Sequence, residues 1–276
     1  MENLYNWFIG LGPGSQAFFA GLFCWTTTMI GAGVVFLNRA VSRKLLDSML
    51  GFAAGVMIAA SIWSLIEPSI EMSEQLGYII WLPATVGFLA GAFVIRLADA
   101  YVPHLHLDLP KDAAEGIQTT WRRATLLVMA ITLHNIPEAL AVGVLFGAAA
   151  SGIDPTGTAT VMGAIVLAIG ISIQNLPEGM AVSMPLRGEG VSRKLSFNYG
   201  QMSGLVYPPF AMLGALAVLF FQPILPYALG FAAGAMIFVV VEELIPTSQR
   251  HGNTDIATLG TVIGFCVMMV LDVALG

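Results

Sequence analysis

Hydrophobic residues run through the chain in long, nearly uninterrupted stretches that short polar segments separate. A membrane-spanning helix needs about 20 predominantly apolar residues, and eight windows of this sequence reach that length. The stretches are too long for the strands of a transmembrane barrel, and they do not alternate between apolar and polar positions. The pattern therefore predicts an all-α integral membrane protein with spans at 15–37, 47–68, 77–98, 122–149, 157–186, 195–220, 224–246 and 256–275.

The composition agrees with this class of protein. Of the 276 residues, 57% are hydrophobic and 10% are charged, whereas a soluble domain is about 25% charged. The net charge of −6 offers no basic surface for nucleic acid. Both cysteines, Cys24 and Cys266, lie in apolar stretches, so no disulfide is expected. Residues 1–16 lack the basic start and small-residue cleavage site of a signal peptide, so the first span is expected to be retained.

Basic residues mark one side of the predicted bundle. They lie in or beside the connections that follow spans 1, 3, 5 and 7, and segments 1–14, 69–76, 150–156 and 221–223 contain none. By the positive-inside rule this side faces the cytoplasm, which places both termini outside a multi-pass cell (inner) membrane protein. The basic residues are Arg39, Arg43, Lys44, Arg96, Lys111, Arg122, Arg123, Arg187, Arg193, Lys194 and Arg250.

One segment of span 2 recurs in span 7. Residues 50–58 and 229–237 share the sequence LGFAAG-x-MI and differ only where Val56 corresponds to Ala235. Because spans 2 and 7 cross the membrane in opposite directions, the match predicts inverted repeats of spans 1–3 and 6–8 around an antiparallel pair of spans 4 and 5. Inverted repeats are typical of transporters. The simpler alternative is that Gly and Ala recur because they allow helices to pack closely.

Two similar motifs, HNIPE at 134–138 and QNLPE at 174–178, interrupt spans 4 and 5. An ionisable side chain inside a spanning helix costs roughly 2.5–3.5 kcal/mol on insertion scales. His134 and Glu138 are four residues apart and so share one helix face, as do Gln174 and Glu178. Each motif also contains a proline, which is expected to kink its helix and free a backbone carbonyl oxygen.

The two motifs together offer an imidazole, two carboxylates and amide oxygens. Imidazole favours Zn, Fe, Ni or Cu, and the oxygen ligands leave Mn and Co open. Two ionised glutamates and one divalent ion sum to zero charge. A kink, a core histidine or a glutamate paired with a neighbouring amide would each explain one motif alone. Two copies on antiparallel helices favour a metal or proton site instead.

With these motifs the chain resembles the ZIP family of divalent-metal transporters, near its bacterial branch. The resemblance rests on HNIPEA, QNLPEG, SGLVYP at 203–208 and the two LGFAAG segments, and it covers nearly the whole chain. It implies one domain, 1–276, with eight helices, usually as a homodimer, that moves metal into the cytoplasm. It also implies an elevator-type carrier in which spans 1, 4, 5 and 6 form a mobile transport unit and spans 2, 3, 7 and 8 a scaffold.

The resemblance further implies which side chains bind and conduct the metal. The alternative to metal binding by Met57 is a packing role, because the repeat places Met236 at the equivalent position. The alternative for the carboxylates of Glu242, Glu243 and Asp272 is that they are solvent-exposed residues at helix ends. The implied metal ligands are His134, Asn135, Glu138, Gln174, Asn175, Glu178 and Met57, and the implied pathway residues are Tyr207, Glu242, Glu243, Asp272 and Ser64.

One position departs from the family pattern. Where relatives usually have glutamate in the span-6 motif, this chain has Tyr207. A phenol with a pKa near 10 is a poor substitute for a carboxylate. Because a second divalent ion would leave the site with excess positive charge, we predict one metal per subunit or an altered metal preference. No cofactor is expected beyond the transported ion, for which zinc leads and Fe, Mn, Co and Cd stay open.

The remaining polar residues carry weaker signals. His251 is expected to be a plain loop residue. The cytoplasmic connection 99–121 contains two histidines, and family loops here are often histidine-rich and collect released metal, but a flexible polar linker is the simpler expectation. Its polar residues are His104, His106, Asp108, Asp112 and Glu115.

Two other functions compete with metal transport. A membrane-embedded metalloenzyme is one, although the chain has neither the HExxH of zinc proteases nor the paired Glu-x-x-His of di-iron bundles. A proton-coupled carrier of an organic solute is the other. An ATP-driven pump is disfavoured because the chain has no GxxxxGK[ST] phosphate loop.

Overall fold

The computed structural model describes residues 2–37, 42–106, 111–151, 160–220 and 222–275. The described residues contain eight helical segments long and apolar enough to cross a membrane, and no strand is formed among them. The eight predicted spans and the all-α class are therefore confirmed. The observed spans are Pro13–Phe36, Arg43–Gln75, Leu82–Tyr101, Arg123–Ser151, Val161–Gly188, Arg193–Phe220, Leu225–Gln249 and Thr254–Leu275.

Five of the eight spans are built mainly from one α-helix each. They are α2 (Pro13–Gly33), α5 (Leu82–Tyr101), α6 (Arg123–Ser151), α7 (Val161–Gly188) and α12 (Thr254–Leu275). Helix α2 continues into a short 3₁₀ turn, η1 (Val34–Phe36). Helices α6 and α7 run without interruption through Pro137 and Pro177, so the prolines do not break the spans that carry the two motifs.

The other three spans change helix type part-way. Span 2 runs α3 (Arg43–Ala60), a π-helical segment η2 (Ser61–Ile66) and α4 (Glu67–Gln75). Span 7 repeats this order as α10 (Leu225–Val239), the π-helical η6 (Val240–Leu244) and α11 (Ile245–Gln249). Span 6 joins α8 (Arg193–Ser203) to α9 (Tyr207–Phe220) through the 3₁₀ turn η4 (Gly204–Val206). Single π turns within helices occur frequently at functional sites, and Ser64 and Glu243 lie on these two.

Local sequence explains where several helices begin. The side chains of Ser42, Thr160 and Ser192 each accept a hydrogen bond from a backbone N–H of the first turn that follows. Such caps satisfy N–H groups that have no partner inside the helix. Pro13, Pro83 and Pro226 lie in the first turns of α2, α5 and α10, where the missing N–H is not needed.

Glycines bring the helices of spans 2, 3, 7 and 8 into backbone contact. A methyl group added at Gly55 of α3 would collide with the carbonyl oxygen of Thr261 in α12. One added at Gly234 of α10 would collide with the carbonyl oxygen of Phe88 in α5. Span 2 therefore packs on span 8 as span 7 packs on span 3, and the predicted inverted repeat makes these two contacts equivalent. Small residues four apart permit this close approach between membrane helices.

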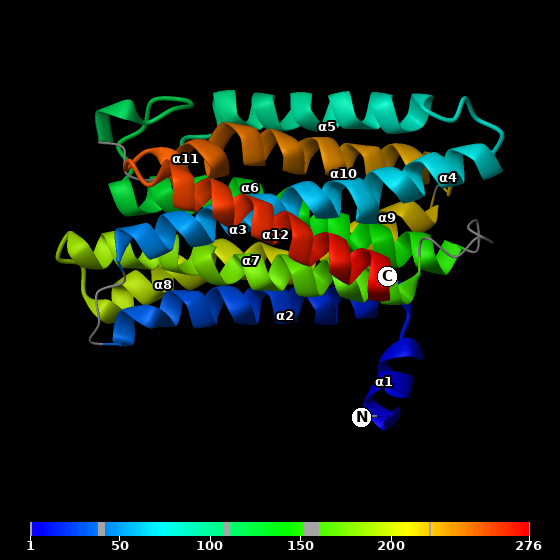
Figure 1. Cartoon of the computed structure of the whole chain (residues 1–276), viewed down its shortest axis with the longest axis horizontal. Helices are drawn as coiled ribbons and strands as arrows, with labels where there is room; N and C mark the ends of the chain where they lie inside the picture. The colour runs from blue at the N-terminus through cyan, green and yellow to red at the C-terminus, as the bar shows by residue number, and fades with distance from the viewer. Residues whose placement is uncertain (1, 38–41, 107–110, 152–159, 221, 276) are drawn as a thin grey trace.

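The remaining spans pair in the same way. Gly31 of α2 lies against the carbonyl oxygen of Leu176 in α7, and Gly143 of α6 lies against that of Ala211 in α9. Span 1 thus packs on span 5 as span 6 packs on span 4. Figure 1 shows the helices side by side along the long axis of the molecule, with α5 at one edge and α2 at the other.

The two ends of the bundle differ in what they hold. The C-terminal ends of α2, α5, α7 and α11 lie towards the left in Figure 1, and the end of α12 lies towards the right. The left end is the one that carries the basic residues of the predicted cytoplasmic side; Arg39 lies outside the described residues. On the sides of the bundle, large apolar side chains such as Leu89, Phe93 and Val273 are more than 60% exposed, as lipid contact requires.

A short helix, α1 (Glu2–Ile9), precedes the first span and was not predicted. The side-chain amide of Gln16 donates to the carbonyl oxygens of Phe8 and Ile9 at 3.2 and 3.3 Å. The ring of Phe8 also lies edge-on to Phe146 of α6. An eight-residue helix is too short to stand out in a search for 20-residue apolar windows.

Candidate metal site between α6 and α7

The two motifs meet in the interior of the bundle. Asn135, Glu138, Gln174 and Asn175 have no exposed surface, and Glu178 is 4% exposed. Glu178 and Glu138 are close enough to interact electrostatically across the two helices. The close contacts of α6 with α9 and of α7 with α2 hold the motif faces inward. The structure therefore brings together carboxylates and amides that are forty residues apart in the sequence.

Tyr207, the first residue of α9, lies in the same place. Its hydroxyl contacts the Glu138 carboxylate, and it lies 2.7 Å from Asn175 Oδ1 and 3.3 Å from Asn135 Oδ1. The two amide groups are turned towards it because each Nδ2 donates elsewhere. Asn135 donates to the carbonyl oxygen of Ser203 at 2.9 Å, and Asn175 donates to that of Cys24 at 3.1 Å. Spans 1, 4, 5 and 6 all contribute to this network.

Several buried polar atoms at the motifs have no hydrogen-bond partner among the described residues. They are Oε1 of Glu138, Oε2 of Glu178 and both polar atoms of the Gln174 side chain. Leaving a buried polar atom unpaired costs about 1–3 kcal/mol, and more for a charged group. Native proteins pair the great majority of such atoms, so a bound ion or an ordered water is expected at this cluster. Carboxylate and amide oxygens are fitting ligands for a divalent cation.

His134 is the motif residue that points elsewhere. Its Nε2 lies 3.1 Å from Oε2 of Glu243 in η6, and Nδ1 of His106 lies 3.0 Å from the same oxygen. Glu243 is 2% exposed, so one buried carboxylate oxygen joins two imidazoles. His134 therefore links the motif on α6 to the connection between α5 and α6.

That connection contains a second cluster of metal-binding groups. Ligand atoms of Asp99, His104, His106 and Glu115 lie within 4.8 Å of one another, and the first three side chains are buried. Nε2 of His104 lies 2.8 Å from Asp99, and Nε2 of His106 lies 3.6 Å from Glu115. The Glu243 carboxylate raises the pKa of His106 to about 9. Burial disfavours the charged form of His104, but the hydrogen bond to Asp99 outweighs it and raises the pKa of His104.

The expectation of a flexible linker is wrong for the described part of this connection. His104 and Glu115 exchange backbone hydrogen bonds of 3.2 and 3.0 Å. Leu105 is fully buried and its N–H donates to the carbonyl oxygen of Leu126. Gly116 turns the chain with a φ of +81°, which favours glycine. The spacing of His104 and His106 was a signal for this cluster; Asp108 lies outside the described residues.

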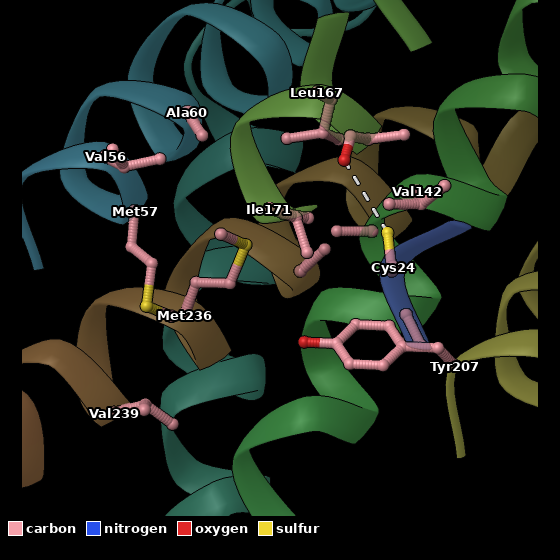
Figure 2. Packing of buried hydrophobic residues seen from close by; sticks show 14 of the residues in the cluster. Cys24, Val56, Met57, Ala60, Val142, Leu167, Ile171, Tyr207, Met236 and Val239 are labelled. Atoms are coloured by element: carbon pink, nitrogen blue, oxygen red, sulfur yellow. Dashed lines mark hydrogen bonds between the residues drawn. The ribbon is translucent and has the colours of Figure 1, made fainter. Parts of the chain in front are cut away.

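The predicted ligand Met57 and the other predicted pathway residues have different surroundings. Ser64 donates a 2.6 Å hydrogen bond to Asp272, which joins η2 to α12. Glu242 is exposed, in contrast to its neighbour Glu243. Met57 is fully buried in the hydrophobic core together with its repeat partner Met236, which Figure 2 draws in the same cluster. The structure gives these four predicted residues no hydrogen bond to the motif side chains among the described residues.

His251 is more than a plain loop residue. Its Nδ1 lies 3.9 Å from Asp47, a fully buried carboxylate that also accepts from Arg43 and from Asn253, each at 2.8 Å. These contacts attach the turn between α11 and α12 to the first turns of α3. They stabilise the cytoplasmic end predicted for this pair of helices and do not reach the motifs.

Eight spans in an inverted repeat, with buried ionisable groups on two antiparallel helices, define a multi-pass membrane protein of the transporter class. The comparisons with known proteins agree. The family profile described as "ZIP Zinc transporter" matches residues 109–272. The chain belongs to this ZIP family of zinc transporters.

Curated relatives align along almost the whole chain. Zinc transporter ZIP11 of Xenopus tropicalis is 42% identical, with 97% of this chain and 99% of that protein covered. Zinc transporter GufA of Myxococcus xanthus is 35% identical, with 93% and 98% covered. Zinc transporter ZIPB of Bordetella bronchiseptica is 36% identical, with 90% and 78% covered. The predicted family is confirmed, and these relatives are named as transporters and not as enzymes.

Proposed function

We propose that this chain carries a divalent transition-metal ion, zinc foremost, across the membrane into the cytoplasm. The ion binds between α6 and α7, where Glu138, Gln174 and Glu178 supply oxygen ligands. The imidazole of His134, which faces Glu243, binds the ion as it leaves these three side chains. The observation that carries the proposal is the group of buried polar atoms on Glu138, Gln174 and Glu178 that have no partner among the described residues. The relatives' names support zinc as the cargo; Fe, Mn, Co and Cd stay open.

The position of Glu243 supports a path towards the predicted cytoplasmic end. Its carboxylate contacts His134 of the motif and His106 of the loop cluster. An ion that leaves the motifs thus meets Oε2 of Glu243, which already contacts His106 of the loop cluster. The cluster of Asp99, His104, His106 and Glu115 would receive the ion before it enters the cytoplasm.

Packing supports an alternating-access mechanism in which two helix groups move against each other. Spans 1, 4, 5 and 6 are joined by glycine contacts at Gly21, Gly31 and Gly143. Glycine contacts at Gly55 and Gly234 join span 2 to span 8 and span 7 to span 3, and the hydrogen bond from Ser69 to the carbonyl oxygen of Pro226 links these two pairs. Between α5 and α10 on one side and α6 and α9 on the other lies an apolar cavity of about 440 Å³. Backbone contact within each group, with side-chain contact between the groups such as that of Gly170 with Met268, would allow the mobile unit to slide as one body.

Zinc uptake into proteoliposomes tests the proposal. The unchanged chain is expected to take up zinc, and the double variant Glu138→Gln/Glu178→Gln is expected to lose more than about 100-fold in initial rate, since replacing groups that only support a metal ligand already costs 10–100-fold. Glu74→Gln, an exposed carboxylate on α4, is the matched control and should retain the rate. Uptake that survives the double variant would contradict the site.

The same preparation separates the competing functions. Metal-dependent turnover of a substrate without uptake would favour a membrane-embedded enzyme, and uptake of an organic solute without metal would favour a proton-coupled carrier. The homodimer, and the cell membrane location with both termini outside, stay predictions. Cross-linking and mass measurement in detergent check the first, and labelling of single cysteines placed in the connections checks the second.

A further inference from the structure

Tyr207 is the largest side chain in the described part of the protein that is fully buried, and its hydroxyl lies among the proposed metal ligands. Figure 2 shows the ring in the core beside Cys24, with the hydroxyl pointing away from the Cys24 thiol. That hydroxyl contacts Glu138, Asn175 and Asn135. A phenol placed only to fill space would not need three polar contacts from two helices.

The backbone holds Tyr207 in one place. It follows the 3₁₀ turn η4 and precedes Pro208, which restricts the first turn of α9. Helix α2 passes so close that a methyl group at Gly21 would lie 2.7 Å from the carbonyl oxygen of Tyr207 and 2.8 Å from Cα of Pro208. Real Cβ atoms do not approach backbone atoms so closely, so the glycine is required there. The backbone of Tyr207 is therefore held close against α2.

The acceptor oxygens around the hydroxyl are fixed as well. The amides of Asn135 and Asn175 each donate to a backbone carbonyl, which leaves their oxygens facing Tyr207. A hydroxyl has one hydrogen to donate. Three oxygens from α6 and α7 converge on it, which is more than that hydrogen can satisfy. Oxygens that converge on one point form the arrangement in which proteins hold a hard or borderline cation.

We propose that Tyr207 is a positioning and specificity-determining residue that takes the place of a second cation. Its hydroxyl fills the point between Asn135, Asn175 and Glu138, and its hydrogen bond holds one oxygen of Glu138. The other oxygen of Glu138 stays free for the ion that Gln174 and Glu178 share. The site then takes one divalent ion, whose charge two carboxylates balance. This inference rests on the proposed function and adds the number of ions and the residue that sets it.

Zinc stoichiometry of the purified full chain tests the number of ions. Because the cluster at Asp99 can also bind zinc, the relevant count is the difference between the unchanged chain and Glu138→Gln/Glu178→Gln at saturating zinc. A difference of about one ion per chain is expected, as the single pair of carboxylates requires. A difference of two would overturn the role of Tyr207 and leave the transport proposal standing. A difference of zero would overturn the transport site itself.

Two substitutions at Tyr207 test its position. Tyr207→Phe keeps the ring and removes the hydroxyl, so Glu138 loses its anchor; zinc should bind about tenfold more weakly, in the range for groups that support a metal ligand. Tyr101→Phe, on an exposed ring at the end of α5, is the control and should bind zinc as the unchanged chain does. Unchanged zinc binding by Tyr207→Phe would overturn the positioning role.

Tyr207→Glu replaces the hydroxyl with a third carboxylate. It should raise the stoichiometric difference to about two ions and shift uptake from zinc towards manganese, because added carboxylate oxygen suits the harder ion. One ion and an unchanged zinc-to-manganese ratio would overturn the specificity role. Should this variant not fold, the stoichiometry of the unchanged chain and the affinity of Tyr207→Phe still decide the proposal.

Discussion

The two copies of the motif, on α6 and α7, are attached to neighbouring spans by equivalent hydrogen bonds but present different side chains to the metal site. Asn135 donates to Ser203 in span 6, and Asn175 donates to Cys24 in span 1. The offset that relates Leu50 to Leu229 also relates Cys24 to Ser203, so the two amide contacts are equivalent in the inverted repeat. The repeat therefore provides both copies with the same attachment to a neighbouring span.

The copies differ where the metal would bind. The motif on α6 has His134, which contacts Glu243, and the motif on α7 has Gln174, which lies beside Glu138 without a well-formed hydrogen bond among the described residues. By the same offset, Thr28 is the repeat equivalent of Tyr207. The Thr28 hydroxyl, however, donates a hydrogen bond within its own helix, to the carbonyl oxygen of Cys24. The comparison teaches that the repeat conserves the packing while single positions make one half of the site unlike the other.

The largest expected effect comes from removing the charge of one copy at a time. Glu138→Gln and Glu178→Gln keep the side-chain shape, and each leaves one negative charge to balance a divalent ion. Each should reduce zinc uptake by more than about 100-fold, although Glu138 is anchored by Tyr207 and Glu178 is not. Initial uptake rates in proteoliposomes measure this. If one variant kept the normal rate, the site would belong to one helix alone.

An exchange of the unlike residues has the next largest effect. His134→Gln removes the imidazole and should slow uptake about 10–100-fold. In the double variant His134→Gln/Gln174→His the imidazole moves to α7. Because Glu243 and His106 lie on the α6 side, the exchanged imidazole has no described link to the loop cluster, and uptake should stay low.

The single variant Gln174→His is the control for the exchange. It keeps His134 in contact with Glu243 and so should transport zinc faster than the exchanged protein does. Restoration of the normal rate by the exchange would mean that the two copies are interchangeable, and that the contact with Glu243 does not matter for transport.

The sequence predicted features that depend on repeated local patterns. Apolar length predicted the spans, and the recurrence of residues 50–58 at 229–237 predicted an inverted repeat, with which the equivalent packing of span 2 on span 8 and span 7 on span 3 agrees. The two motifs predicted that Glu138 and Glu178 lie together, because each carboxylate interrupts an apolar span and has a matching segment in the other span.

What the sequence did not predict depends on contacts between distant segments. Glu243 looked like a helix-end carboxylate, and only the packing of η6 against α6 places it beside His134. The connection after α5 looked polar and flexible because Leu105 and Gly116, which fold it back, carry no periodic signal. The π-helical segments η2 and η6 were not predicted either, because they lie inside long apolar stretches.

The smallest effect is expected from the packing behind each copy. Gly31→Ala would push α2 away from α7, and Gly143→Ala would push α9 away from α6, since each added methyl collides with a backbone carbonyl oxygen. Overpacking of this kind costs about 1–3 kcal/mol. Both variants should melt at lower temperature in detergent, and by similar amounts, while the folded fraction still transports zinc.

Gly188→Ala, at the end of α7 where an added methyl meets nothing within 4 Å, is the matched control and should melt like the unchanged chain. A large difference between Gly31→Ala and Gly143→Ala would show that the supports of the two copies are unequal. The asymmetry of the site would then begin in the packing of the helices, and not only at His134, Gln174 and Tyr207.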